Sequence, residues 1–284
     1  MLGQRIITAV ALLAILLPAL FYPSPVPFGV VALVLMGAAA WEWARLNGFT
    51  GAAAVAVGAA CVALCLASWA AGWLTATVST AWVIVGGAWV LGGGLLLRGG
   101  VSGWPRIPRN VRLVVGVLGL WLAWLAVAQA RVVGINFLLS VLLLVWVADI
   151  FAYFVGRAFG LKFTKARLAP AISPGKSWEG VWGGMAGVVA MAAGWVWADV
   201  HWQAQVDSLY TRLAHQGWWL LLTGVVFMAA MSVVGDLVES LIKRSAGVKD
   251  SSGLLPGHGG VLDRVDALLP TLPLAMMLAS LTAR

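Results

Sequence analysis

The chain has 284 residues, of which 62% are hydrophobic and only 10% are charged, and its formal net charge is +8. A soluble globular domain normally carries about 25% charged residues, and a disordered chain lacks this apolar content, so the composition excludes both classes. Apolar runs of about twenty residues recur from end to end, and each is long enough to cross a bilayer core of roughly 30 Å. We therefore predict a single all-α domain over residues 1–284, a polytopic integral membrane helix bundle.

Nine membrane-spanning helices are predicted between the turn signals and the charged residues. In chain order they cover about residues 5–22, 27–46, 51–70, 74–97, 112–130, 134–157, 179–199, 217–242 and 262–282. The first span has the basic flank of a signal peptide, but further spans follow at once, so we expect it to stay as a helix. Cys61 and Cys65 lie one turn apart in an apolar run, where small packing residues are expected and a disulfide is not.

The basic residues are distributed unevenly between the two sides of this arrangement. On the side of the N-terminus lie 15 of the 18 Lys and Arg residues, and Arg131, Arg212 and Arg284 lie on the other. Because cytoplasmic loops carry the excess of basic residues, this pattern predicts a cytoplasmic N-terminus and an external C-terminus. The positive charge then faces anionic membrane lipids in the cell inner (plasma) membrane, and nucleic acid is not expected as a partner.

Most of the ten acidic residues lie in the second half of the chain. Glu42, Asp199 and Asp207 are expected to be solvated, at a helix end or in the outer loop. The other seven lie in or beside the last two long cytoplasmic connections: Asp149, Glu179, Asp236, Glu239, Asp250, Asp263 and Asp266. We therefore predict a catalytic half at residues 131–284, whereas the helices of residues 1–130 serve packing, lipid entry or a dimer surface.

Asp149 lies inside an otherwise apolar run, about two helical turns before Arg157. A charge at the middle of a span costs about 2.5 to 3.5 kcal/mol on insertion scales, so the presence of Asp149 there requires a structural or functional explanation. One reason is a basic partner such as Arg157, and the other is a polar cavity that opens to the cytoplasm. The cavity is favoured slightly, because Tyr153 follows at i+4 on the same helix face.

The segment from Asp236 to Asp266 carries the densest polar pattern. Asp236, Ser240 and Lys243 line one stripe of a helix, and Asp263 and Asp266 stand on the first turn of the last span. Carboxylates from two adjacent helix ends are a common way to hold a divalent cation.

The same segment contains groups that suit phosphate. The paired glycines Gly259 and Gly260 allow close approach of a backbone to phosphate, and four cations can neutralise its oxygens: Lys243, Arg244, Lys249 and Arg264. Carboxylates for a metal beside cations for phosphate are typical of phosphoryl or nucleotidyl transfer. The open alternative is a salt-bridged loop that only anchors the chain at the membrane face.

The preceding loop reads ISPGKSWEG from Ile172 to Gly180. Its GKS triplet resembles the end of a P-loop, but the first glycine of that motif would fall at Pro170, so a P-loop is excluded. Ser177 precedes a helix whose first turn includes Glu179, which suits an N-cap. Anion binding by Lys176 and the same helix N-terminus is the alternative.

In these segments the chain resembles the phosphatidate cytidylyltransferases, also called CDP-diacylglycerol synthases. The family signature is followed throughout by Ser240-x-x-Lys243-Arg244, four residues, Lys249-Asp250, then Pro256-x-His258-Gly259-Gly260-x-x-Asp263-Arg264-x-Asp266. Two further stretches agree: Ser173-Pro-Gly-Lys176-Ser177-x-Glu179-Gly180 and Asp149-x-x-x-Tyr153-x-x-Gly156-Arg157-x-x-Gly160. The specific motifs cover the C-terminal half, whereas residues 1–130 match only in being apolar and of suitable length.

The resemblance implies transfer of a cytidylyl group from CTP to phosphatidate, which gives CDP-diacylglycerol and pyrophosphate in phospholipid biosynthesis. It also implies a Mg²⁺ centre at Asp236 and Asp263, with a monovalent cation such as K⁺. Membrane lipids are expected as partners, and the sequence leaves open whether a second copy of the chain is one. The remaining phosphate charge is then expected to fall to Lys243, Arg244, Lys249 and Arg264. Asp250 and Asp266 are expected to complete or orient the metal shell. The residues expected to bind substrate are Ser173, Lys176, Ser177, Ser240, His258, Gly259 and Gly260, of which His258 serves either the loop or the substrate.

Three other classes compete with this interpretation. A transporter also has an intramembrane acid and glycine-broken helices, but its polar residues would lie near the bilayer midplane. A transferase that consumes a CDP-activated lipid would need D-G-x-x-A-R spacing, which is absent from the sequence. A divergent cytidylyltransferase that uses another lipid phosphate differs only in its acceptor pocket.

Overall fold

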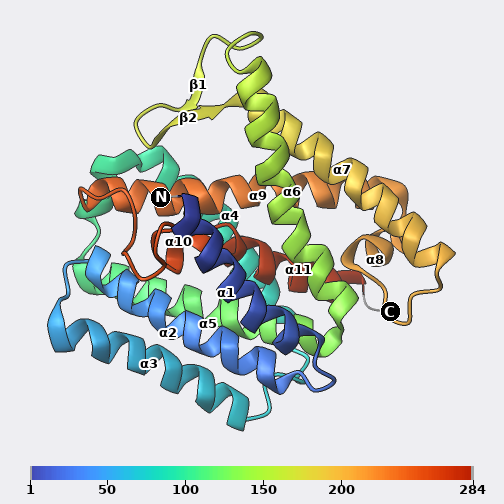
Figure 1. Ribbon diagram of the computed structural model, residues 1–284, viewed down its shortest axis with the longest axis horizontal. Helices are drawn as coiled ribbons and strands as arrows, with labels where there is room; N and C mark the ends of the chain where they lie inside the picture. Colours follow the sequence, from blue (N-terminus) through green and yellow to red (C-terminus); the bar gives the residue numbers. More distant parts are fainter. Residues whose placement is uncertain (1, 283–284) are drawn as a thin grey trace.

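The computed structural model describes residues 2–282, which fold almost entirely into helices (Figure 1). Within these residues nine helical segments are long and apolar enough to cross a membrane, which confirms the predicted all-α polytopic fold. They are α1 (Leu2–Phe21), α2 (Val26–Leu46), α3 (Gly51–Ala70), α4 (Ser79–Gly103), α5 (Arg109–Val133), α6 (Ile135–Phe159), α7 (Trp178–His201), α9 (Trp218–Ser245), and α10 (Leu262–Val265) taken together with α11 (Leu268–Thr282).

Four short elements fill the connections: η1 (Trp104–Arg106), β1 (Arg167–Ala169), β2 (Ser173–Ser177) and α8 (Leu209–Gln216). The two strands form an antiparallel hairpin in which Arg167 pairs with Ser177, and its register is irregular. The sequence predicted only a loop here, because strands this short do not show the alternation of apolar and polar residues that identifies a strand. In Figure 1 the hairpin projects beyond the end of α6, directly before α7.

Consecutive long helices run in opposite directions, so their ends form two faces. Thr8 Oγ1 at the start of α1 donates to Pro256 O at 2.9 Å, which places the N-terminal end of α1 beside the loop that precedes α10. On the opposite face, Gln216 Nε2 donates to Thr282 O at 3.4 Å. The face that carries the hairpin, the end of α9 and residues 246–261 is called the hairpin face. The predicted basic side coincides with it, and Arg284 lies outside the described residues.

Glycines let α6 and α7 pack closely along their length. A Cβ atom added at Gly183 would lie 2.4 Å from Val155 Cβ, and one added at Gly184 would lie 2.7 Å from Ala148 O. Small residues at such contacts let backbones approach in lipid, where the hydrophobic effect does not drive helices together. Gly183 and Gly184 thus provide the close contact between α6 and α7.

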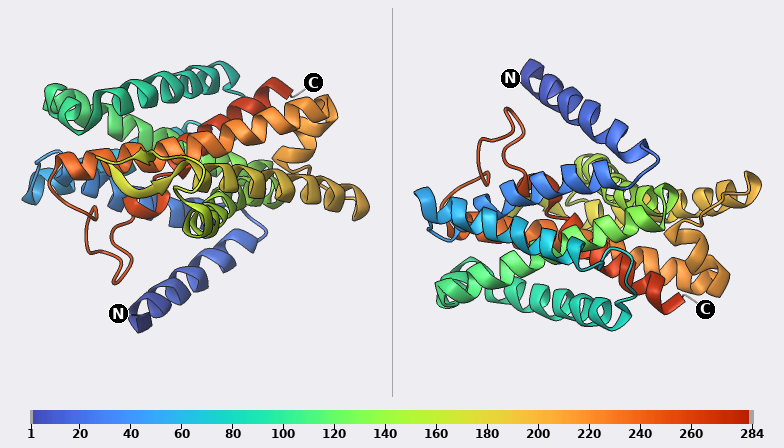
Figure 2. Two further views of the ribbon diagram at one scale, coloured as in Figure 1. Left: turned by 90° about the horizontal axis from the view of Figure 1, so that it is seen from above. Right: turned by 90° about the horizontal axis from the view of Figure 1, so that it is seen from below.

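The bundle is layered, and its outer helices expose apolar side chains. Figure 2 shows α1 leaning away from the body on one side, with α4 on the opposite side. Ile7 and Val10 on α1 are 70% and 59% exposed, as expected for side chains that face lipid. The two cysteines are free and buried, as predicted.

The prediction that Asp199 is solvated is wrong. Its side chain is buried, and its oxygens accept from Asn136 Nδ2 at 2.8 Å, Thr211 Oγ1 at 2.6 Å and Ser208 N at 3.1 Å. A buried carboxylate needs such donors, and here they fix α8 against α6 and α7. Asp207 remains partly exposed, as expected, with His215 3.6 Å away.

Candidate active site

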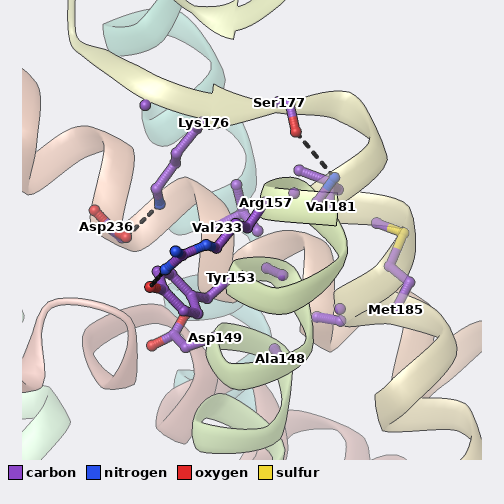
Figure 3. A pocket seen from close by; sticks show the side chains of 16 residues that line it. Ala148, Asp149, Tyr153, Arg157, Lys176, Ser177, Val181, Met185, Val233 and Asp236 are labelled. Atoms are coloured by element: carbon purple, nitrogen blue, oxygen red, sulfur yellow. Dashed lines mark hydrogen bonds and ion pairs between the residues drawn. The ribbon is translucent and has the colours of Figure 1, made fainter. Parts of the chain in front are cut away.

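A cavity of about 550 Å³ lies between α6, α7, α9 and β2, near the hairpin face (Figure 3). Its polar wall consists of Asp149, Tyr153 and Arg157 from α6, Lys176 and Ser177 from β2, and Asp236 from α9. Its apolar wall includes Ala148, Val181, Met185, Ala229 and Val233. One cavity therefore joins charged groups of both signs to a surface that suits hydrocarbon.

Lys176 and Asp236 form an ion pair across this cavity, as Figure 3 shows. Their side chains are 28% and 27% exposed, so both remain accessible to a ligand. Ser240 Oγ donates to the other oxygen of Asp236 at 3.3 Å. The ion pair joins segments that are 60 residues apart in sequence, because the hairpin folds back over the end of α9.

Ser177 ends β2 and caps α7. Its side-chain oxygen accepts from Gly180 N at 3.2 Å, so the N-cap expected from the sequence is present. Glu179 fixes the preceding loop, because its Oε1 accepts from Phe163 N at 3.1 Å and from Thr164 N at 2.7 Å. Together the cap and this carboxylate hold β2, and hence Lys176, at the mouth of the cavity.

Asp149 faces the cavity and is exposed within it. None of the ion pairs found among residues 2–282 involves Asp149, and Arg157 Nη1 instead donates to Tyr153 OH at 2.9 Å. Asp149 also lies within electrostatic range of Asp236, Lys176 and Arg264. This placement favours the polar cavity over a dedicated Arg157 partner.

A second polar cluster lies beside the cavity and is buried, and we call it the Asp263 network. Asp263 Oδ1 lies 2.6 Å from Lys243 Nζ, and Lys243 Nζ lies 2.5 Å from Glu239 Oε2. Asp263 Oδ2 accepts from Ser251 N at 2.9 Å and from Gly260 N at 2.7 Å. Lys243 is only 12% exposed, and two carboxylates already neutralise its charge.

Asp266 lies between the two groups. It is within electrostatic range of Asp236 and Asp149 in the cavity and of Lys243 in the Asp263 network. The chain approaches α9 closely at this point, since a Cβ added at Gly235 would lie 2.6 Å from Asp266 O. Glycine at 235 therefore brings the start of the last span next to Asp236.

The other predicted site residues support the loops around the cavity. Arg244 donates to Ile172 O at 3.3 Å and to Val248 O at 3.4 Å, and so joins the hairpin to the end of α9. His258 N donates to Leu255 O at 2.8 Å, and its Nδ1 is buried without a partner among the described residues. The more open positions are Ser173, partly buried in β2, and Lys249, Asp250 and Arg264, all exposed.

Gly259 and Gly260 are each required by the structure, for different reasons. Gly259 has a φ of +82°, a conformation that glycine adopts at low cost. A Cβ at Gly260 would lie 2.1 Å from Ser251 Oγ and 2.3 Å from Glu42 Oε1. In this structure both glycines make room for carboxylates and loop atoms, and their contact with substrate stays a prediction.

The described residues contain no group of three or more His, Cys, Asp or Glu side chains placed to hold a metal ion. Mg²⁺ in phosphate-binding sites commonly uses only one or two carboxylates, with water and substrate phosphates as its other ligands. The carboxylates of Asp236 and Asp149 face the cavity and fit this requirement. Asp263 points its oxygens into its own network, so its predicted pairing with Asp236 on one ion stays a prediction.

Sequence reasoning missed Glu42 and Glu239. The prediction that Glu42 is solvated is wrong: its side chain is fully buried and bonds to the loop before α10. The available signal was an acid between Trp41 and Trp43 in an apolar span, which is costly unless the carboxylate is bonded. Glu239 could have been identified because it stands four residues before Lys243 on a predicted helix, a spacing that allows an ion pair. The structure contains this ion pair.

Fold and site together define a multi-pass membrane protein whose charged cavity suits a phosphorylated ligand with an apolar part. Residues 3–282 match the model of the cytidylyltransferase family. The chain is 39% identical over 280 residues to a phosphatidate cytidylyltransferase of Pseudomonas aeruginosa, which covers 96% of this chain and 95% of the relative. It is 48% identical over 140 residues to the enzyme of that name from Haemophilus influenzae, over 49% of this chain and 44% of the relative. The chain therefore belongs to the cytidylyltransferase family, which confirms the resemblance seen in its motifs.

Proposed function

We propose that this protein transfers a cytidylyl group from CTP to phosphatidate and releases CDP-diacylglycerol and pyrophosphate, as a step of phospholipid synthesis. The observation that carries the proposal is the cavity in which Lys176, Asp236 and Arg157 share walls with apolar residues of α6, α7 and α9. A soluble nucleotide alone would not need the apolar wall, and a neutral lipid would not need the charged one. The name of the relative from Pseudomonas aeruginosa, which this chain matches over nearly its whole length, agrees with both requirements.

The reaction joins two anions. An oxygen of the phosphatidate phosphate attacks the α-phosphorus of CTP, the bond from that phosphorus to the oxygen bridging the α- and β-phosphates breaks, and pyrophosphate leaves. Lys176 and Arg157 offset the repulsion between the anions and orient them for in-line attack. The attacking phosphate is already ionised, so the proposal needs no general base.

Mg²⁺ is part of the proposal, with a monovalent cation such as K⁺ beside it. Asp236 and Asp149 would hold Mg²⁺ at the cavity wall, and Asp263 would join them if its network rearranged on substrate binding. When bound, the ion supplies positive charge to the phosphates of CTP and to the leaving pyrophosphate. With Asp236 on the ion, Lys176 would lose its carboxylate partner and could bind phosphate instead.

We also propose that the hairpin face is cytoplasmic and that the protein lies in the bacterial inner membrane. The basic excess on this face supports that orientation, because positively charged loops are retained in the cytoplasm. CTP would then reach the cavity from its own compartment. A homodimer through the helices of residues 1–130 is a further part of the proposal.

The test measures pyrophosphate release and lipid product with detergent-purified protein, CTP, phosphatidate and Mg²⁺. Asp236→Asn is the variant, and Asp207→Asn, a partly exposed acid on the opposite face, is the matched control. We expect turnover with CTP but not with ATP, loss of turnover in Asp236→Asn, and wild-type rates in Asp207→Asn. Chelation with EDTA should stop the reaction, and added Mg²⁺ should restore it.

Other outcomes separate the alternatives. Turnover only with another lipid phosphate would overturn the acceptor and retain the cytidylyl transfer. A folded protein that releases no pyrophosphate with any lipid phosphate, yet moves a substrate across vesicles, would overturn the enzyme in favour of a transporter.

A further inference from the structure

Glu42 on α2 is a fully buried carboxylate that accepts four hydrogen bonds. Its Oε1 accepts from Val261 N at 3.0 Å and from Ser252 Oγ, and its Oε2 accepts from Leu262 N at 2.7 Å and from Ser251 Oγ at 3.1 Å. All four donors lie about 210 to 220 residues away in sequence, in the segment 251–262. We call this arrangement the Glu42 clasp.

The clasp holds a charge without a basic partner. None of the ion pairs in the described part of the chain includes Glu42, so its charge is spread over four N–H and O–H donors. A buried, ionised carboxylate is very costly without such donors, and hydrogen bonds to a charged group are stronger than those between neutral groups. The segment is therefore fixed to α2 and does not move as a free loop.

The clasp is directly continuous with the Asp263 network. Ser251 Oγ lies 3.1 Å from Glu42 Oε2 and 3.0 Å from Asp263 Oδ2, and Leu262, whose amide Glu42 binds, is the neighbour of Asp263 in sequence. The Ser251 hydroxyl has one proton, which it shares between the two carboxylates, while its backbone N–H donates to Asp263. A shift of the segment away from α2 would therefore move Asp263 with it and leave Lys243 with one partner fewer.

The tight fit at Gly260 indicates that this geometry is specific. A Cβ there would lie 2.3 Å from Glu42 Oε1 and 2.6 Å from its carboxyl carbon, closer than real Cβ contacts. Gly260 of the signature segment thus accommodates a side chain from the N-terminal half of the protein. This gives the first helices a role beyond lipid entry or a dimer surface.

We propose that Glu42 is a positioning residue for the reaction, and this rests on the proposed cytidylyl transfer. It touches neither substrate, and it acts by holding segment 251–262 so that Asp263, Arg264 and Asp266 keep their places beside the cavity. The N-terminal half of the chain thereby completes the active site of the C-terminal half.

The test compares Glu42→Gln with Asp199→Asn in the full, detergent-purified chain. Asp199 is the matched control, because it is also a buried carboxylate that holds a connection, but on the opposite face. For Glu42→Gln we expect kcat/KM to fall about 10- to 100-fold, as for other residues that orient a site from behind. The KM for CTP should rise at least about threefold, whereas a smaller folded fraction alone would lower kcat and leave KM unchanged. Asp199→Asn should lower thermal stability with KM within twofold of wild type.

Hydrogen exchange provides a readout that does not depend on activity. In Glu42→Gln the amides of Val261 and Leu262 should exchange at least tenfold faster, while those of α9 should not change. If wild-type protein makes no CDP-diacylglycerol, the proposed function fails and this comparison still tests the clasp. If Glu42→Gln does not fold, Ser252→Ala removes a single donor and should give the same local exchange with a two- to fivefold loss of kcat/KM. Unchanged KM and unchanged exchange in either folded variant would overturn the proposal, as would an equal KM shift in Asp199→Asn.

Discussion

The contact between α6 and α7 gives a sharp test of how packing positions the cavity. Gly183→Ala would place a Cβ 2.4 Å from Val155 Cβ and within 2.7 Å of both Val155 γ-carbons. Gly194→Ala on the same helix is the matched control, because its Cβ would meet nothing within 4 Å. Both changes gain about 1 kcal/mol of helix propensity, and only Gly183→Ala has an overpacking cost of about 1 to 3 kcal/mol. The difference in stability between the two variants therefore isolates the cost of the clash.

The assay is thermal unfolding in detergent, paired with turnover of CTP and phosphatidate. We expect Gly194→Ala to unfold at or slightly above the wild-type temperature, and Gly183→Ala to unfold at least about 3 °C below Gly194→Ala. Relief of the clash moves α7 away from α6 and takes Lys176 with it, so turnover should also fall about tenfold in Gly183→Ala. Equal unfolding temperatures and equal turnover in the two variants would refute the reasoning that glycine sets this distance.

Three further predictions concern single side chains. Lys176→Met and Asp236→Asn should each lower kcat/KM roughly 100-fold. Because the pair acts as a unit, the double variant should lose no more activity than the more damaging single variant. Additive losses in the double variant would contradict this. Asp149→Leu should raise the unfolding temperature, because it removes an unpaired charge from a membrane span, and it should lower turnover at least tenfold. A variant that unfolds below the wild-type temperature would show that Asp149 has a structural partner. Burial raises the pKa of Tyr210, whose OH donates to Ser140 O at 2.6 Å, so its contribution to stability is present below about pH 10 and is lost as pH rises. Wild type should therefore be more stable than Tyr210→Phe at pH 8, by about 1 kcal/mol in unfolding free energy, and this advantage should shrink above pH 10.

The helices could be predicted from the sequence because each is a local pattern. An apolar run long enough to span a bilayer, bounded by charges or glycine, specifies one helix without reference to any other part of the chain. The ends were less certain for a physical reason: α4 begins at Ser79 and not near residue 74, because residues 71–76 form a turn in place of a further helical turn. The hairpin β1–β2 depends on contacts with α7 and α9, which a local pattern cannot contain.

For the candidate site, the residues could be predicted from the sequence, but their arrangement in space could not. Lys176, Asp236 and Asp149 could be identified because charged residues in or beside apolar spans need a cavity, a partner or a ligand. Their meeting in one cavity depends on how α6, α7 and α9 pack, and the sequence does not specify that geometry. Glu42 was misjudged because its donors lie about 210 residues away, and an acid at a helix end has a simpler local explanation in solvent.

Two kinds of carboxylate serve the site, and their surroundings assign them different tasks. Asp236 is partly exposed and has one cation and one hydroxyl as partners, so a metal ion can replace these contacts at small cost, and a phosphate can replace Asp236 as the partner of Lys176. Glu42 is fully buried and uses its oxygens on backbone amides and hydroxyls, which no ligand can supply once they are removed. Groups that exchange partners during turnover therefore lie on the cavity wall, and groups that must not exchange lie behind it. In a membrane this separation is more important than in water, because a loop freed from its carboxylate near the bilayer has few other donors or acceptors to bind.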